Sequence, residues 1–401
     1  MFQEDSATSP RRQWSLMVYK RKGFFMTQQM PRIKILIFLF SVTGLLAAPG
    51  WALTPDLPQQ SFVPDSQPAQ FCMQSFNAYG PAYARDIHER TQWIAAELQA
   101  RPRCDVIQLQ EVWNNDQIDQ VEEPLKPFYE ISDPNRKERI GVMSLFAGDD
   151  QEKAIKSVET HDFTLNSDGN ILDRGRALFN VKKAFHVVRA SLPSVNEDLY
   201  FMNTHLHPTS QAVRLTQIFE LLEWRLQHQD LKLFLSGDFN GDEHSLERAV
   251  MMFFLGVHDS LNETLGGAYP EGVCTYCKGN PYSWLLSDHV LDYIFFSNVS
   301  KSATHVQALD GKINMRGTGR MPLSDHFGLR VQFAIENGKS VATSKILEQR
   351  RNYAMEIFAK VEKVLSGNDQ SFQRALTKVQ QLRLQLQQRQ GLFNAYFEKF
   401  N

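Results

Sequence analysis

Short apolar runs that end abruptly in polar turns recur along the chain. One of them, Leu233–Leu235, passes through Ser236 into residues 237–241, which read GDFNG. Apolar runs of this length bounded by glycine predict buried strands. Because the glycines permit close backbone approach, Asp238 and Asn240 can converge at the strand's C-terminal end. The turn is therefore either a site for a hard cation and a phosphate or a plain loop with a solvated Asp and Asn.

Two earlier runs predict strands of the same kind, separated by a helix. Residues 71–76 lead to Asn77, which is either a turn residue or a site carboxamide. Residues 84–100 have helical spacing and stop before a proline. The run 105–110 then delivers Glu111. A carboxylate at the end of an apolar strand is costly to desolvate unless it is paired or bound to a metal, which favours a functional role for Glu111.

A further strand, residues 199–206, ends among histidines. His205 and His207 flank Leu206 at its end. A histidine at a strand end is commonly a hydrogen-bonded structural residue, and a catalytic role for His205 is the other interpretation. An amphipathic helix over residues 215–226 follows and connects this strand to the GDFNG turn.

Asp292 is embedded in the otherwise apolar run Val290–Phe296 and needs a partner. The most economical partner is a histidine whose imidazolium it stabilises. Two Ser-Asp-His triplets compete, one ending in His289 and one ending in His326. The second introduces its own strand, residues 327–333, so it can come alongside Asp292 in three dimensions. We therefore predict a pair between His326 and Asp292.

The pattern is weakest between residues 140 and 189. A strand is predicted at 141–146, followed by a polar, acidic insertion through Asp173 and a second strand at 177–181. Lys182 and Lys183 are interpreted as part of a solvated face.

The last part of the chain, residues 336–401, carries two helical stripes. Apolar positions recur from Tyr353 to Val364 and again from Phe372 to Leu386, with Gly367 between them. This spacing predicts a helical hairpin that packs on the preceding domain. A membrane contact or an unidentified protein partner is the alternative.

The N-terminus predicts export. Basic residues precede the apolar run Ile35–Ala48, which is short for a membrane span and leads to Ala52. Residues 1–52 are interpreted as a leader and signal peptide, with a retained anchor as the alternative, and the Pro-, Gln- and Ser-rich residues 53–70 as a linker. The protein is then secreted or periplasmic.

Composition narrows the function further. The 401 residues are 42% hydrophobic, which allows a sizeable core. The first 52 residues carry seven basic and two acidic side chains, so the remaining chain has a net charge near −7. This balance disfavours a binder of nucleic-acid backbone.

Four cysteines fit an oxidising compartment. Cys274 and Cys277 form a C-x-x-C for which a small disulfide loop is favoured over a zinc site, because no second ligand pair follows at suitable spacing. Cys72 and Cys104 each lie at the start of a predicted strand and can bridge if those strands are parallel neighbours.

Taken together, the motifs resemble the endonuclease/exonuclease/phosphatase family, also called DNase I-like. Six short motifs carry the resemblance across residues 71–335 in the family's order: Asn77, Gln110-Glu111, Asn203-Thr204-His205, Gly237-Asp238-Phe239-Asn240, Leu291-Asp292-Tyr293 and Ser324-Asp325-His326. Within this family, the sequences of residues 109–113 and 204–206 are most similar to those of neutral and bacterial sphingomyelinases. The resemblance implies an α/β fold, a four-layer sandwich of two packed β-sheets flanked by helices, here with a C-terminal helical extension.

The resemblance also implies a metal site. Glu111 is expected to hold an essential Mg²⁺, or another divalent cation, with Asn77 and Asp325 nearby. Oxygen and carboxamide ligands suit such a hard cation.

The implied catalytic set surrounds this metal. His326 is expected to be the general base for water, oriented by Asp292, and His205 to donate to the phosphoryl oxygens. Asp238 and Asn240 are expected to complete the metal and nucleophile site. Such a set supports in-line attack of water on a phosphodiester.

We therefore expect a secreted, Mg²⁺-dependent phosphodiesterase acting on sphingomyelin or a related phospholipid at a membrane surface. A secreted DNase I-like nuclease is the first alternative, disfavoured by the acidic chain. A non-catalytic binding module or effector is the second, and the intact metal and His–Asp sets argue against it. Tyr276, Tyr282 and Trp284 are candidates for an interfacial contact.

Overall fold

The computed structural model describes residues 68–81, 83–148, 153–167, 182–300, 304–317, 321–337, 344–368 and 370–399. The predicted leader and nearly all of the predicted linker lie outside the described residues, as does the strand predicted at 177–181. Within the part that is described, no helix combines the length and the apolar character that crossing a bilayer requires.

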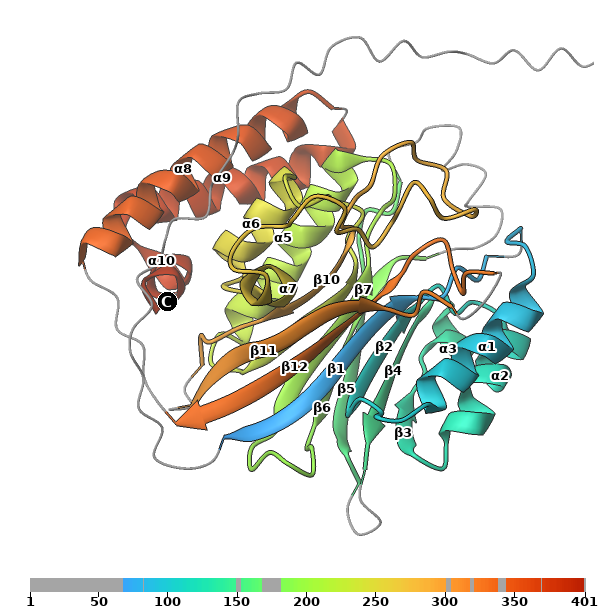
Figure 1. Cartoon of the computed structure of the whole chain (residues 1–401). Helices are drawn as coiled ribbons and strands as arrows, with labels where there is room; N and C mark the ends of the chain where they lie inside the picture. Colours follow the sequence, from blue (N-terminus) through green and yellow to red (C-terminus); the bar gives the residue numbers. More distant parts are fainter. Residues whose placement is uncertain are drawn as a thin grey trace, which may run out of the picture. The chain divides into compact units, whose positions relative to one another are not determined.

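Two six-stranded sheets form the centre of the described fold (Figure 1). The first has the order β11 (Thr304–Asn314), β12 (Gly328–Asn337), β1 (Ala69–Asn77), β2 (Val106–Gln110), β4 (Val142–Ala147), β3 (Tyr129–Ser132). The second has the order β5 (Ile155–Asp162), β6 (Ala184–Ala190), β7 (Leu199–His205), β8 (Leu233–Asp238), β10 (Asp292–Phe296), β9 (His258–Asp259).

Each sheet contains one parallel pair at its middle, β1 with β2 and β7 with β8, and the other neighbours are antiparallel. A parallel pair needs a crossover connection, which α1 (Ile87–Gln99) and α5 (Gln211–Gln227) supply. The carboxyl ends of both strands in a parallel pair therefore lie at the same edge of their sheet, which gathers the predicted strand-end residues.

Helices cover the outer faces, which gives the four layers that the resemblance implies (Figure 1). Before the C-terminal extension, the helices that follow strands of the first sheet are α1, α2 (Asn115–Leu125) and the short α3 (Asn135–Glu138). Those that follow strands of the second are α5, α6 (Leu246–Phe254) and α7 (Ser260–Thr264). The predicted four-layer α/β sandwich is confirmed.

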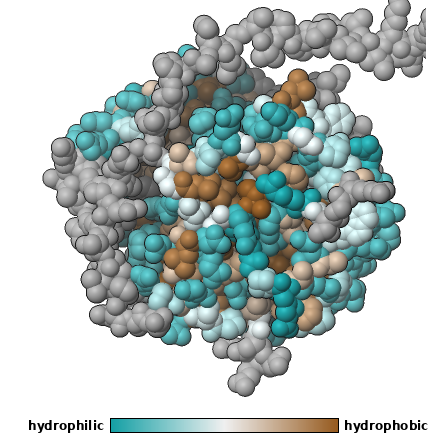
Figure 2. Space-filling view, in the orientation of Figure 1, coloured by the Kyte–Doolittle hydropathy of each residue, from teal (hydrophilic) through white to brown (hydrophobic). Residues whose placement is uncertain are grey.

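Aromatic side chains fill the space between the sheets. Phe71 of the first sheet packs edge-on against Phe234 of the second at 5.1 Å between ring centroids, and Phe201 stacks on Phe234 at 5.4 Å. Such burial between two sheets is the main source of their cohesion. On the face shown in Figure 2, hydrophilic residues cover most of the surface and hydrophobic groups are scattered among them.

The C-terminal extension consists of α8 (Ser344–Ser366), a 3₁₀ turn (Gln370–Phe372), α9 (Gln373–Gln388) and α10 (Gly391–Lys399). Its apolar stripe joins the core of α5 and α6, where Phe358 stacks on Phe254 at 4.4 Å. The helices lie along α5 and α6 in Figure 1. Packing on the domain, rather than an uncovered apolar face, accounts for the helical stripes.

Part of the predicted insertion is a strand. Residues 155–162 form β5, which pairs only with β6 at the edge of the second sheet. Most of its side chains are exposed or half-buried, so it lacks the apolar alternation of an inner strand. Because this alternation is missing, residues 155–162 were predicted as part of a polar insertion, and that prediction was wrong for this stretch. The next strand along the chain is β6, residues 184–190.

Candidate functional site

The predicted strand-end residues lie together where the two sheets meet. Asn77 ends β1 and Glu111 follows β2 in the first sheet, while His205 ends β7 and Asp238 ends β8 in the second. Asp292 begins β10, directly opposite Asp238 in the antiparallel register. Polar side chains from five separate segments thus share one buried region.

Asp238 is the centre of this region. Asn77 Nδ2 donates to its Oδ2 at 3.0 Å, and the backbone N–H of Asn240 donates to its Oδ1 at 2.9 Å. The Nε2 atoms of His205 and His326 lie 3.5 and 3.6 Å from Oδ2. Asp238 therefore connects side chains from both sheets.

The predicted His–Asp pair is present. His326 Nδ1 lies 2.7 Å from Asp292 Oδ2, and both side chains are buried. The competing His289 lies instead beside Ser287, with 2.6 Å between Nε2 and Oγ, and 3.7 Å from a carboxylate oxygen of Asp242. The structure therefore brings the second Ser-Asp-His triplet, and not the first, to Asp292.

Charge surrounds His326 on several sides. Burial disfavours its protonated form, but the carboxylates of Asp292, Asp238 and Asp325 outweigh burial and raise the pKa of the imidazole well above its ordinary value. Asp238, Asp292 and His326 offer ligand atoms within 4.8 Å of one another. Because the hydrogen bond between His326 and Asp292 uses one atom of each, we interpret this group as a base with its orienting carboxylate.

Glu111 has the surroundings of a metal ligand. Its Oε2 is buried and accepts no hydrogen bond from the described residues, while Oε1 lies 3.7 Å from His205 Nε2. Burial, then the charge of Asp325, raises the pKa of Glu111 to about 7. Burial also raises the pKa of Asp238 to about 6. A divalent cation among these carboxylates would remove the cost of burying them, so the donor set fits such an ion.

Asp325 lies in the same buried region as the other acidic groups. Its side chain accepts a hydrogen bond from Ser324 Oγ at 3.2 Å, and burial raises its pKa. A second group of possible metal ligands, away from these carboxylates, contains Cys274, Cys277 and Asp288. The two sulfurs are joined in a disulfide there, so they are not available to a metal.

Unusual backbone conformations accompany these side chains. Tyr79, Glu111 and Asn240 adopt φ angles of 48°, 58° and 50°, in the left-handed region that non-glycine residues rarely occupy. All three lie in turns that follow site strands, where such strain aims side chains into a site. Gly237 has φ 152°, and a Cβ there would lie 1.9 Å from the carbonyl oxygen of Thr204. The glycine thus allows β8 to approach β7.

A buried polar network ties the two sheets together beneath the site. Gln110 Nε2 donates to Asn203 Oδ1 at 2.8 Å, and Asn203 Nδ2 donates to the carbonyl of Leu109 at 3.0 Å. Ser236 Oγ donates to Gln108 Oε1. These hydrogen bonds cross between the sheets away from water and help to fix their relative position, while Gln108 Nε2 and Gln110 Oε1 have no hydrogen-bond partner among the described residues.

Two buried cationic side chains, Lys183 and Arg90, were not predicted from the sequence. Lys183, predicted on a solvated face, is buried, lies 6.0 Å from the ring of Trp113 and lowers the pKa of Glu111 electrostatically. Lys183 lies just before β6, where the fold brings it beside Trp113. Nothing in the local sequence signals this burial.

Arg90 is the second missed cation and is 1% exposed. It donates to the carbonyls of Ala78, Tyr79 and Leu323 at 3.1, 2.7 and 2.9 Å. It therefore joins the turn after Asn77 to the segment that precedes the second Ser-Asp-His triplet. Its place on the same helical face as Ile94 could have identified it as a buried arginine.

The aromatic residues in and after the C-x-x-C differ from the prediction. Tyr276 and Tyr282 are buried, because Tyr276 packs on His326 and Tyr282 packs against Tyr79 and the guanidinium groups of Arg85 and Arg90. Trp284 is 80% exposed, and two leucines follow it: Leu285 is 45% and Leu286 96% exposed. The interfacial candidate among the predicted aromatics is therefore Trp284 alone.

The favoured Cys274–Cys277 disulfide and the conditional Cys72–Cys104 disulfide are both formed. Cys72 in β1 and Cys104 before β2 are joined, since those strands are parallel neighbours. Cys274 and Cys277 close a four-residue loop.

Comparisons with solved structures agree on the fold. Truncated TDP2 from Caenorhabditis elegans has 19% identity and a TM-score of 0.50, over 66% of this chain and 98% of that chain. An endonuclease/exonuclease/phosphatase family protein from Bacteroides thetaiotaomicron has 18% identity and a TM-score of 0.51, over 67% and 99%. TDP2 from D. rerio, complexed with a single-strand DNA product, has 18% identity and a TM-score of 0.51, over 66% and 99%.

At such low identity these likenesses establish the fold and leave the substrate open. No curated protein matches the chain. The family model described as Endonuclease/Exonuclease/phosphatase family matches residues 75–326, which is more than half of the chain and includes every predicted site residue. This protein belongs to the endonuclease/exonuclease/phosphatase family.

Proposed function

We propose that the protein is an exported, Mg²⁺-dependent phosphodiesterase that hydrolyses the headgroup of sphingomyelin or a related phospholipid. The observation that carries the hydrolytic part is the orphaned, buried Oε2 of Glu111 beside a hydrogen-bonded His326–Asp292 pair. Glu111, with Asn77 and Asp325, would hold the cation. When bound, a divalent cation polarises the phosphoryl group.

The geometry of the other residues supports the roles that we assign to them. His326 takes the proton of the attacking water at Nε2, and Asp292 stabilises the imidazolium that forms. His205, whose Nε2 faces Glu111 and Asp238, donates to a phosphoryl oxygen. Asp238 and Asn240 orient the attacking water and the neighbouring site side chains, among them Asn77, which donates to Asp238.

The lipid part of the proposal is supported by the loop beside the site. Trp284, Leu285 and Leu286 are exposed, and the backbone N–H of Trp284 donates to the hydroxyl of Tyr276, whose ring lies 4.8 Å from that of His326. Apolar side chains in such a position suit docking at a lipid surface. The net charge near −7 of the chain after residue 52 disfavours a polyanion. The predicted leader supports export.

The test is a substrate panel for the purified chain without residues 1–52. Sphingomyelin vesicles, phosphatidylcholine vesicles and plasmid DNA are each incubated with Mg²⁺ or with a chelator, across a salt series. We expect chelator-sensitive hydrolysis of vesicles with little dependence on salt. Efficient DNA cleavage that falls steeply with salt, with vesicles untouched, would replace the lipid substrate by nucleic acid. Hydrolysis unaffected by chelator would remove the metal role.

A further inference from the structure

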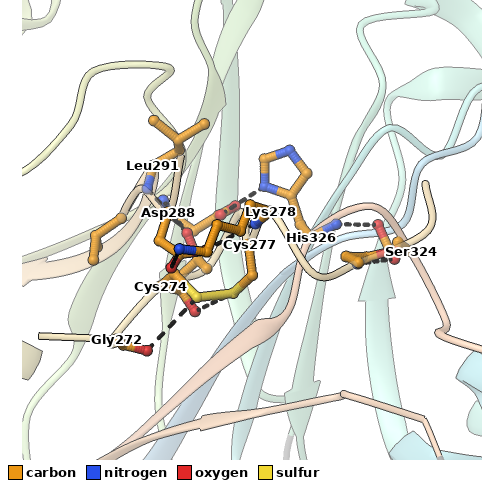
Figure 3. Close-up of a disulfide and its surroundings, with 12 residues drawn as sticks. Gly272, Cys274, Cys277, Lys278, Asp288, Leu291, Ser324 and His326 are labelled. Atoms are coloured by element: carbon orange, nitrogen blue, oxygen red, sulfur yellow. Dashed lines mark hydrogen bonds and ion pairs between the residues drawn. A yellow bond between two sulfur atoms is a disulfide. The ribbon is translucent and has the colours of Figure 1, made fainter. Parts of the chain in front are cut away.

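The loop closed by Cys274 and Cys277 contacts both segments that carry the His326–Asp292 pair. Figure 3 shows the disulfide beside the backbone of Leu291 on one side and His326 on the other. The two partners come from different sheets, because Asp292 begins β10 and His326 precedes β12. The hydrogen bond between them therefore depends on how these two segments are aligned.

Thr275, inside the loop, is fully buried and makes hydrogen bonds to both segments. Its Oγ1 accepts from the backbone N–H groups of Leu291 at 2.9 Å and Asp292 at 3.1 Å. Its carbonyl oxygen accepts from the backbone N–H of Phe327, the residue after His326, at 2.7 Å. One residue thus holds the backbone on each side of the pair.

Neighbouring loop residues add two more contacts to the His326 segment. The Tyr276 ring packs against the His326 ring at 4.8 Å between centroids, with 69° between the planes. Asn280 Nδ2 donates to the carbonyl of Ser324 at 2.8 Å. The loop therefore restricts His326 in two ways, through the ring contact with Tyr276 and through the hydrogen bond to Ser324 at the start of the triplet.

Little regular structure holds this loop apart from the disulfide. Among the described residues its ladder pairing is the single bridge between Tyr276 and His289. A covalent link across the four residues restricts the backbone of Thr275 in a way that this bridge alone does not. Because a displacement of about 1 Å of a catalytic group costs roughly a hundredfold in rate, such restriction matters for the pair.

We propose that Thr275, held by the Cys274–Cys277 disulfide, is a positioning residue that aligns His326 with Asp292. This inference rests on the proposed role of that pair in hydrolysis. Thr275 touches neither the substrate nor the reacting atoms and acts through the two backbone segments that it joins.

The first experiment compares Thr275→Val with Thr275→Ser in the full chain. Valine keeps the shape of threonine but removes the Oγ1 acceptor, whereas serine retains it. Thr377→Val makes the same change on α9, where the hydroxyl bonds only within its own helix, and is the matched control. Two readouts are taken: the downfield proton resonance of the His326 ring N–H, assigned by its absence in His326→Ala, and kcat and KM on bis(p-nitrophenyl) phosphate.

We expect Thr275→Val to shift or broaden the His326 resonance and to lower kcat by roughly tenfold or more with KM within about twofold. Thr275→Ser and Thr377→Val should resemble the wild type in both readouts. A Cys274→Ala, Cys277→Ala double variant keeps Thr275 but loosens it, so its resonance should change in the same direction. This variant also tests the inference should Thr275→Val fold poorly.

The outcomes separate this inference from the proposed function. A resonance that is absent from the wild type, or unchanged in Thr275→Val and in the double cysteine variant, overturns the positioning role. A resonance that depends on Thr275 in a protein that hydrolyses no phosphodiester supports the positioning role and contradicts the proposed function. Equal losses of kcat in Thr275→Val and Thr275→Ser would show that the hydroxyl is not the aligning group, which also overturns it.

Discussion

Among single residues, Glu111 carries the negative charge that we expect to bind the divalent cation directly. Glu111→Gln keeps the shape of the side chain and removes this charge, so we expect activity to fall by about two orders of magnitude or more. Folding should be retained, because glutamine relieves the buried charge. Glu123→Gln, on an exposed part of α2, is the control and should leave turnover unchanged. Near-normal Mg²⁺-dependent turnover in Glu111→Gln would remove this residue from the site.

The raised pKa values of Glu111 and Asp238 predict how metal binding depends on pH. Burial raises these pKa values to about 7 and about 6, so below pH 7 the metal-free protein retains protons that a cation must displace. Affinity should therefore fall on lowering the pH, by up to about tenfold per unit for each carboxylate. Calorimetric titration with Mg²⁺ at pH 8 and pH 6, in buffers of different ionisation enthalpy, should show proton release mainly at pH 6. Equal affinity and no proton release at both values would contradict this.

The histidines of the two Ser-Asp-His triplets, His326 and His289, can be compared by matched alanine substitutions. His326 bonds to buried Asp292, whereas His289 lies at the surface beside Ser287. His326→Ala should lower kcat by roughly a hundredfold to ten-thousandfold, the usual contribution of a general base. His289→Ala should stay within about threefold. The reverse ranking, measured on one phosphodiester substrate, would assign the base to the first triplet.

At the scale of elements, the loop that follows the second disulfide presents its apolar side chains outward. A Trp284→Ser, Leu286→Ser double variant removes apolar surface that burial stabilises by about 25 cal/mol per Å². We expect vesicle binding, measured by co-sedimentation, to fall by roughly tenfold or more, with hydrolysis of soluble bis(p-nitrophenyl) phosphate unchanged. Leu384→Ser, at a 51% exposed position of α9, is the control. Should the double variant bind vesicles normally, the loop has no part in docking.

Elements also show where local pattern was informative. A polar residue that ends an apolar run is visible in the sequence, and the structure places Asn77, Glu111, His205 and Asp238 at such strand ends. The edge strand β5 was not visible, because an edge strand exposed on both faces carries no apolar alternation.

At the scale of the whole molecule, the C-terminal helices share a core with the second sheet's helices. Phe358 packs between Phe254 and Phe393, at 4.4 and 5.9 Å between ring centroids. Phe358→Ala should lower the free energy of unfolding by about 3–5 kcal/mol, because a large cavity opens in this core. Leu384→Ala on the exposed face of α9 should change it by no more than about 0.5 kcal/mol.

The measurement is urea-induced unfolding followed by two probes, tryptophan fluorescence and far-ultraviolet circular dichroism. A single coincident transition in the wild type is expected, since one continuous core unites α5, α6 and the extension. Two separate transitions, with Phe358→Ala affecting only one, would show that the extension folds independently.

Features that depend on local order along the chain could be predicted before the fold was known. Short apolar runs with polar ends identified the inner strands, and the order of six motifs indicated the family and its four layers. Even the pairing of His326 with Asp292 followed from a local property, because the triplet at 324–326 introduces a strand of its own.

The side chains outside these motifs that are buried beside the site became evident from the three-dimensional fold and not from the sequence. Lys183 lies beside the ring of Trp113, which belongs to the other sheet's connections, and Arg90 is held in part by the carbonyl of Leu323, more than two hundred residues further along the chain. Tyr276 is covered for the same reason, by the ring of His326. Burial of a single residue is set by whichever distant surface the fold brings against it, and the local pattern of polar and apolar positions carries no record of that surface.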